Sequence, residues 1–208
     1  MRTYAIKEIF LTLQGEGYWS GRRSVFVRFA GCNLWSGREE DRGKGPGGCS
    51  AWCDTDFVGG ERYTAIELAR KAASLWGPGR LRRFAVLTGG EPMLQADWDL
   101  IATLHRYEFY VAMETNGTRE VDRLTDWITV SPKAGGDLVQ RWAQELKLVY
   151  PQPGAEPERF AGMEFQHRFL QPLDGPDREA NTRAAAEYCL AHPEWRLSLQ
   201  THKIAGIP

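Results

Sequence analysis

The sequence predicts an α/β fold: an incomplete βα barrel of mostly parallel strands with helices outside it. Two observations lead to this prediction. After residue 20, short runs rich in Val, Ile, Leu and Phe alternate with helical patterns, and several connections between the runs are too short for a complete helix. The first observation is typical of buried parallel strands. The second favours a partial, open barrel over one with eight complete βα units.

The expected strands are short apolar runs bounded by polar or glycine-rich residues. They cover residues 25–29, 84–87, 109–113, 127–130, 145–149, 168–171 and 196–199. Helices are expected at residues 64–76, 97–107 and 176–192. In the first helix, Thr64 and Glu67 have the spacing of a capping box, and apolar residues recur on one face. Strands separated by helices imply parallel pairing.

Composition limits the class of protein. The chain has 208 residues, of which 42% are apolar and 25% charged, so we expect one domain spanning residues 1–208. The formal net charge of −1 gives no bulk attraction to nucleic acid. No signal-peptide pattern opens the sequence and no apolar run approaches the roughly 20 residues of a membrane span. These features predict a cytoplasmic protein without a membrane partner, whose cysteines stay reduced.

Polar and glycine-rich segments follow five of the expected strands. In an α/β sheet the active site lies beyond the carboxyl ends of the strands, so these segments are expected to form one composite site. They are residues 31–33, 88–92, 114–117, 131–133 and 171–175.

Three of the four cysteines crowd into one stretch of the chain. Cys32 follows the first expected strand, and Cys49 and Cys53 come after a glycine-rich loop. Three thiolates can hold a [4Fe–4S] cluster and leave one iron open for another ligand. On spacing alone, a zinc site lacking its fourth ligand and unrelated buried thiols remain alternatives. Cys189 lies on a helical pattern and is expected to be a small core residue.

Four motifs, in this order along the chain, resemble the radical S-adenosylmethionine (SAM) superfamily, and more closely the family of 7-carboxy-7-deazaguanine synthases. They are Leu13-Gln14-Gly15-Glu16-Gly17, Arg28-Phe29-Ala30-Gly31-Cys32-Asn33-Leu34-Trp35, Cys53-Asp54-Thr55-Asp56 and Thr88-Gly89-Gly90-Glu91-Pro92. The resemblance extends from Lys7 to Pro208. The cysteine gaps of sixteen and three residues depart from the common C-x₃-C-x₂-C pattern of the superfamily.

The resemblance implies a radical SAM lyase of queuosine biosynthesis. Such an enzyme converts 6-carboxy-5,6,7,8-tetrahydropterin into 7-carboxy-7-deazaguanine with loss of ammonia, through a radical made from SAM rather than a protein acid or base. It also implies three cofactors, which are a [4Fe–4S] cluster, SAM and Mg²⁺, together with a flavodoxin-type reductant and a homodimer.

The same resemblance implies roles for single residues. The cluster would be held by Cys32, Cys49 and Cys53, and Mg²⁺ by Thr55. SAM would lie against Trp52, Asp54, Gly90, Glu91, Ser131, Pro132, Lys133, Gln171, Pro172, Leu173 and Asp174. The substrate would contact Leu13, Gln14, Gly15, Glu16, Arg28, Thr88, His202 and Pro208, and Glu114 is a further candidate for either ligand.

Without the resemblance, several of these positions have ordinary structural interpretations. Residues 88–92 can form a generic strand-to-helix turn, and Ser131-Pro132 and Asp174-Gly175 can form surface turns. Residues 54–56 can cap a helix or form an Asx-turn. Two other functions also remain open: another radical SAM enzyme, such as a glycyl-radical activase, or a zinc-binding module without catalysis.

Overall fold

The computed structural model describes residues 2–79 and 81–208, and its strands form one nine-stranded sheet in the order β3-β1-β2-β4-β5-β6-β7-β8-β9. From β2 to β9 every neighbouring pair of strands is parallel, whereas β1 pairs antiparallel with both β2 and β3. Among the described residues β3 and β9 do not pair, so the sheet is not closed. The prediction of an incomplete, mostly parallel barrel is therefore confirmed. The strands are β1 (Tyr4–Leu13), β2 (Arg23–Phe29), β3 (Glu61–Tyr63), β4 (Phe84–Gly89), β5 (Tyr110–Thr115), β6 (Trp127–Val130), β7 (Trp142–Tyr150), β8 (Glu164–Pro172) and β9 (Trp195–Leu197).

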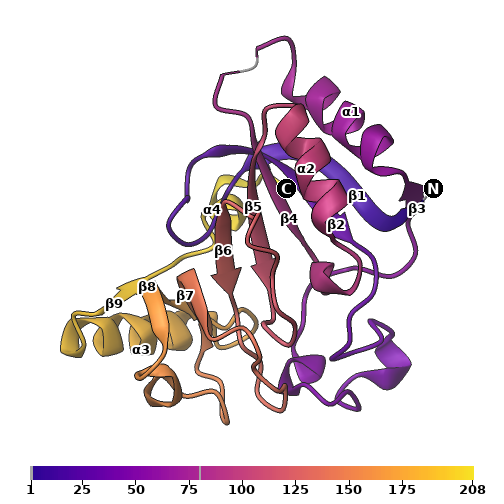
Figure 1. Ribbon diagram of the computed structural model, residues 1–208. Helices are drawn as coiled ribbons and strands as arrows, with labels where there is room; N and C mark the ends of the chain where they lie inside the picture. The colour runs from indigo at the N-terminus through magenta and orange to yellow at the C-terminus, as the bar shows by residue number, and fades with distance from the viewer. Residues whose placement is uncertain (1, 80) are drawn as a thin grey trace.

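Helices cover two separate parts of the sheet. Helices α1 (Ala65–Trp76) and α2 (Trp98–Arg106) lie side by side, α1 against β1 and β2 and α2 against β5, while α3 (Arg178–Ala191) contacts β8 and β9 (Figure 1). The connections from β5 to β6 and from β6 to β7 contain no helix, as their length predicted. The remaining helical segments are α4 (Thr201–Ala205) and the 3₁₀ turns η1 (Glu39–Asp41), η2 (Gly48–Ala51), η3 (Pro92–Leu94) and η4 (Pro157–Phe160).

The helix starts follow from local sequence. Thr64 caps α1 by accepting a hydrogen bond from the Glu67 amide at 3.3 Å, and the Glu67 carboxylate accepts one from the Thr64 amide at 2.8 Å. This reciprocal pair is the capping box that the sequence predicted. Asp97 caps α2 through a single hydrogen bond, which its carboxylate accepts from the Leu100 amide at 3.1 Å.

Strands β1 and β3 were not predicted. In β1 the apolar alternation is interrupted by Lys7 and Glu8, and the register against β2 shifts between Ile6 and Glu8. Such a bulge reverses which residues face the core, so a strict alternation cannot be read from the sequence. Strand β3 has only three residues and buries none of them.

The core lies between the sheet and the helices. It includes Val86, Leu87, Ile128 and Leu146 from the strands, which are at most 1% exposed, and the helix α2 packs Leu104 against them. Burying side chains of this size stabilises the fold by about 1.5–3 kcal/mol each. Because β2 and β4 to β9 are parallel, their carboxyl ends lie at one edge of the sheet, where the functional residues gather. No helix in the described part of the chain is long and apolar enough to cross a membrane.

Candidate active site

A cavity of about 320 Å³ opens at this carboxyl edge. It brings together most of the residues predicted from the sequence: Leu13, Gln14, Gly15, Glu16, Arg28, Cys32, Cys49, Trp52, Cys53, Asp54, Thr55, Thr88, Gly90, Ser131, Lys133, Gln171, His202 and Pro208. Five predicted residues do not line it: Glu91, Pro132, Pro172, Leu173 and Asp174. The expectation of one composite site at the strand ends agrees with this geometry.

The three clustered cysteines all line the cavity. Cys32 follows β2, and its sulfur accepts a hydrogen bond from the Leu34 amide at 3.4 Å. Cys49 lies on η2, and the Cys53 amide donates to the Cys49 carbonyl at 2.7 Å. The three-residue gap therefore completes one α-type turn, which places residues four apart on the same side of the backbone. The extra residue is accommodated without turning either thiol away from the cavity.

The glycines between Cys32 and Cys49 allow their loop to pack closely. A Cβ atom on Gly45 would lie 2.1 Å from the Leu34 carbonyl oxygen, and one on Gly47 would lie 2.8 Å from the Leu34 Cβ. The Gly48 amide also donates to the Ala134 carbonyl at 2.6 Å. Only residues without a side chain fit at these contacts, so the glycine-rich composition fixes the position of Cys49.

The three thiols are candidate ligands for a metal centre. Burial raises the pKa of Cys32 and raises that of Cys49 to about 11, so both would become thiolates only when a metal displaces the proton. No group of three His, Cys, Asp or Glu side chains among residues 2–79 and 81–208 is gathered tightly enough for one metal ion. Three cysteines at one cavity are also the ligand set of a [4Fe–4S] cluster with one open iron.

The Thr88–Pro92 segment is held against the end of β2. A Cβ atom on Gly89, where φ is +123°, would lie 2.4 Å from the Phe29 carbonyl oxygen, and one on Gly90 would lie 2.1 Å from that of Gly31. The amides of Gly90 and Glu91 donate to those same two carbonyls. The two glycines are thus required by the close approach of the protein's own backbone.

The Glu91 side chain supports this segment from behind. It is completely buried and accepts hydrogen bonds from the Met93 amide at 2.9 Å, the Thr115 hydroxyl at 2.7 Å and the Asn116 amide at 2.7 Å. These contacts join the end of β4 to the end of β5. The carboxylate therefore points into the protein and supports the cavity wall without lining it.

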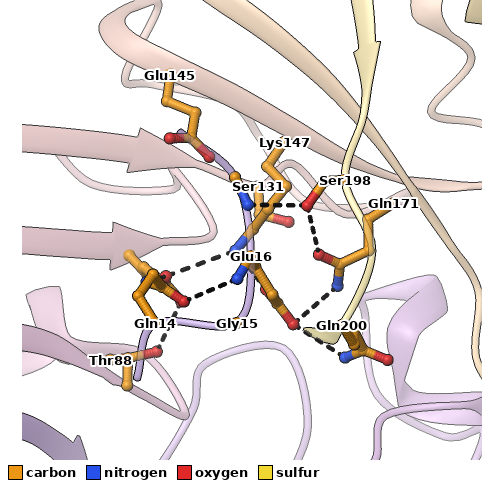
Figure 2. A network of polar contacts seen from close by, with 12 residues as sticks. Gln14, Gly15, Glu16, Thr88, Ser131, Glu145, Lys147, Gln171, Ser198 and Gln200 are labelled. Atoms are coloured by element: carbon orange, nitrogen blue, oxygen red, sulfur yellow. Dashed lines mark hydrogen bonds and ion pairs between the residues drawn. The ribbon is translucent and has the colours of Figure 1, made fainter. Parts of the chain in front are cut away.

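Figure 2 shows a network of charged and amide side chains in the wall of the cavity. Lys147 of β7 lies 2.5 Å from Glu16 and 3.5 Å from Glu114. Gln171 and Gln200 donate to the other oxygen of Glu16 at 3.1 and 2.9 Å. Burial alone would raise the pKa of Glu16, but Lys147 and these donors outweigh it and hold that pKa at about 2. Glu16 is thus ionised at neutral pH.

Cationic groups lie elsewhere in the cavity wall. Arg28 lies 2.7 Å from the Glu8 carboxylate, but its Nε is buried and out of line for a hydrogen bond. Arg28 also lines the cavity, where a guanidinium group is suited to an anionic ligand. Lys203 bridges Asp54 at 2.7 Å and Asp174 at 2.6 Å, which brings Asp174 to the rim of the cavity although it does not line it.

One wall of the cavity comes from the residues after β9. His202 packs on Gly15, where an added Cβ would lie 2.0 Å from the His202 ring. The Thr201 amide donates to the Gly15 carbonyl at 2.9 Å, and the Thr12 hydroxyl donates to the Pro208 oxygen at 2.5 Å. The positions of His202 and Pro208 next to the end of β1 agree with their expected place at the substrate.

Sequence reasoning missed several lining residues. The aromatic side chains of Phe10, Phe26, Trp35 and Phe57 line the cavity and gave no functional signal. Lys147 and Gln200 were also missed. A signal for Lys147 existed, because Glu145 and Lys147 alternate with apolar residues in a strand of an otherwise apolar sheet. Two charges on one face of a buried strand point into the barrel interior. Cys189 lies on α3 away from the cavity lining, as expected.

An open parallel βα barrel with three cysteines at its carboxyl edge is the architecture of a radical SAM enzyme. The structure resembles the crystal structure of QueE from Escherichia coli with a TM-score of 0.75 and 27% identity, over 95% of this chain and 94% of that one. The sequence is 55% identical to the 7-carboxy-7-deazaguanine synthase of Caulobacter vibrioides over 99% of this chain and all of that protein. It is 56% identical to the synthase of Bradyrhizobium diazoefficiens over 99% of both chains. This chain belongs to the 7-carboxy-7-deazaguanine synthase family.

None of the established family profiles matches the chain. The relatives nevertheless share one name over a wide range of similarity; a synthase of Nitratidesulfovibrio vulgaris, for example, is 47% identical over 99% of this chain and all of that protein. The family implies a [4Fe–4S] cluster and SAM as cofactors. It favours the synthase interpretation over the glycyl-radical activase and the zinc-binding module.

Proposed function

We propose that this chain converts 6-carboxy-5,6,7,8-tetrahydropterin into 7-carboxy-7-deazaguanine with loss of ammonia, as a step of queuosine biosynthesis. One observation carries the proposal: residues from five strand ends and from the segment after β9 surround one cavity that also holds three cysteines. The full-length identity to synthases supports the same reaction.

The residues at the cavity fit the implied cofactors. Cys32, Cys49 and Cys53 would hold the cluster and leave one iron free for SAM. Backbone carbonyls near Gly90 would accept hydrogen bonds from the amino group of SAM, because the amides of Gly90 and Glu91 already donate to other carbonyls. Trp52, Asp54, Ser131, Lys133 and Gln171 would surround the rest of SAM, with Pro132, Pro172, Leu173 and Asp174 behind them. When bound, the cluster and SAM supply an organic radical that removes hydrogen from the substrate.

The chain's own residues bind and orient the substrate. Arg28 lines the cavity, and its planar guanidinium is suited to pairing with the substrate carboxylate. Thr55 would share a Mg²⁺ ion with that carboxylate, because a hydroxyl, a carboxylate and water are ligands that Mg²⁺ accepts. The ionised Glu16 would accept from the N–H groups of the pterin ring. Leu13, Gln14, Gly15, Thr88, His202 and Pro208 would enclose the ring.

The cell context of the enzyme belongs to the same proposal. The four cysteines are unpaired thiols, which suits the reducing cytoplasm. A flavodoxin-type reductant, a homodimer and a single domain are proposed from the family resemblance. These features can be tested apart from the reaction.

Anaerobic reconstitution tests the proposal. The purified chain is loaded with iron and sulfide, its iron and sulfide content is measured, and it is mixed with SAM, a reductant and the tetrahydropterin. The expected product is 7-carboxy-7-deazaguanine, with about four irons per chain. A colourless zinc-loaded protein that forms no product would contradict the proposed function.

A further inference from the structure

Lys147 is a buried cation in the cavity wall for which the family resemblance assigned no role. Its residue is 5% exposed, and lysine is almost never buried this deeply unless it is paired. Its ammonium lies 2.5 Å from the Glu16 carboxylate and 3.5 Å from the Glu114 carboxylate. One cation therefore holds together an acid that follows β1 and an acid at the end of β5.

The two carboxylates keep open acceptor positions toward the cavity. An ionised carboxylate has about four lone-pair positions. Glu16 uses three of these positions, one for Lys147 and two for Gln171 and Gln200. Glu114 accepts hydrogen bonds from the side-chain amide of Gln14 at 2.9 Å and from the Thr88 hydroxyl at 3.2 Å. Because both acids line the cavity, each can accept a further hydrogen bond from a ligand.

The local charge favours a ligand edge that carries N–H donors. Glu16 and Glu114 share one ammonium, so neither carboxylate has a cation of its own, and an incompletely paired buried charge is costly. A cation or a pair of N–H groups relieves this cost through charge-assisted hydrogen bonds. The pyrimidinone edge of a tetrahydropterin carries an amino group beside a ring N–H, which supplies two adjacent donors.

We propose that Lys147 is a positioning residue that sets specificity: it holds Glu16 and Glu114 side by side so that together they accept from the amino group and ring N–H of a 2-aminopyrimidinone. This inference rests on the proposed function, because the tetrahydropterin is its ligand. If Lys147 formed only a structural ion pair, it would stabilise the fold without changing which ring the cavity binds.

Equilibrium binding under anaerobic conditions separates these interpretations without any turnover. The two probes are 6-carboxytetrahydropterin and its counterpart with a 2-oxo group in place of the 2-amino group. Lys147→Met removes the charge and retains much of the length of the side chain, Lys147→Arg restores a charge, and Lys71→Met on the exposed face of α1 is the matched control. We expect Lys147→Met to weaken binding of the amino compound about ten- to a hundredfold and to abolish the preference for it. Lys147→Arg should recover part of the preference, and Lys71→Met should equal the wild type.

The pH profile provides a second readout. His202 faces Glu16, and Glu114 and Glu145 face Lys147. Because the pKa of Glu145 is about 7 in the wild type as well, the wild-type profile between pH 5 and pH 7 is the reference. Lys147 keeps Glu16 ionised over this range in the wild type. In Lys147→Met the pKa of Glu16 rises, so binding of the amino compound should weaken more steeply from pH 7 to pH 5 than in the wild type.

Glu16→Gln removes the same ion pair by neutralising the partner of Lys147, and glutamine has nearly the same volume as glutamate. It should also abolish the preference for the amino compound, and its effect should not add to that of Lys147→Met. Unchanged selectivity in a folded Lys147→Met, or in Glu16→Gln if the first variant does not fold, overturns the inference while the proposed function stands. A wild type that binds neither compound overturns both.

Discussion

Replacing Glu91 by alanine should destabilise the whole fold, because its buried carboxylate accepts three hydrogen bonds. The change leaves the Met93 amide, the Thr115 hydroxyl and the Asn116 amide without a partner inside the protein. Each buried donor left unsatisfied costs about 1–3 kcal/mol, so we expect a loss of about 3–9 kcal/mol from the three donors. For a chain of this size, each kcal/mol lowers the midpoint of thermal unfolding by about 2–4 °C, so the midpoint should fall by roughly 6 °C or more.

Glu91→Gln separates shape from charge. The glutamine can keep its carbonyl oxygen toward Met93 and Thr115, but its NH₂ group then faces the Asn116 amide, and two donors oppose each other. We expect a loss of about 2–3 kcal/mol, smaller than that of the alanine variant. Glu187→Ala on the exposed surface of α3 is the control and should change the free energy of unfolding by less than about 0.5 kcal/mol.

Urea unfolding followed by circular dichroism measures all three variants against the wild type. If the free energy of unfolding of Glu91→Ala lies within 1 kcal/mol of the wild-type value, the carboxylate does not satisfy those donors, and the account of the Thr88–Pro92 segment is wrong.

Four other changes test the site and its surroundings. Cys53→Ala should abolish iron uptake and the brown colour of the reconstituted protein, while Cys189→Ala should leave both intact; iron retained by the first variant would disprove the ligand assignment. Thr55→Ala should weaken the stimulation of turnover by Mg²⁺, and equal rates with a chelator and with millimolar Mg²⁺ would remove the ion from the mechanism. Arg28→Lys should lower kcat/KM about ten- to a hundredfold because an ammonium cannot pair with both carboxylate oxygens, and unchanged kinetics would contradict this role. Burial raises the pKa of Glu145 to about 7, so the folded state favours its protonated form. The stability that this proton contributes is present below pH 4.5 and is lost as the pH rises to 7; Glu145→Gln should not show this loss, which is up to about 3 kcal/mol in urea unfolding.

The parallel part of the fold could be predicted because its strands are buried on both faces. Strands such as β6 are continuous apolar runs, and the sequence predicted its bounds without error. By contrast, β1 carries Lys7 and Glu8 across a bulge, so its pattern matches neither strand nor helix. Antiparallel pairing of β1 with β2 is set by long-range contacts that local sequence does not specify.

The candidate site also contains some residues that the sequence predicted and others that it did not. Residues at strand ends were found because chain order and strand direction fix which ends share an edge. Lys147 lies within a strand, where its side chain reaches the cavity only because the barrel curves around it. For Glu91 the motif position predicted a cofactor contact, but the sequence did not show that its carboxylate faces the end of β5. Sequence order gives the position of a residue on an element, whereas the partner of its side chain depends on packing.

The contacts between the end of β1 and the residues after β9 have a consequence for how the molecule folds. They join groups separated by 196 residues at Thr12 and Pro208 and by 181 residues at Gly17 and Ser198. Contacts of such long range form only after most of the chain has ordered, since closing a loop of this length costs entropy that nothing local repays. The sheet can therefore assemble before this side of the cavity does. Because few backbone pairs join the two segments, they can separate locally while the core stays intact, and a bound ligand would favour the joined state.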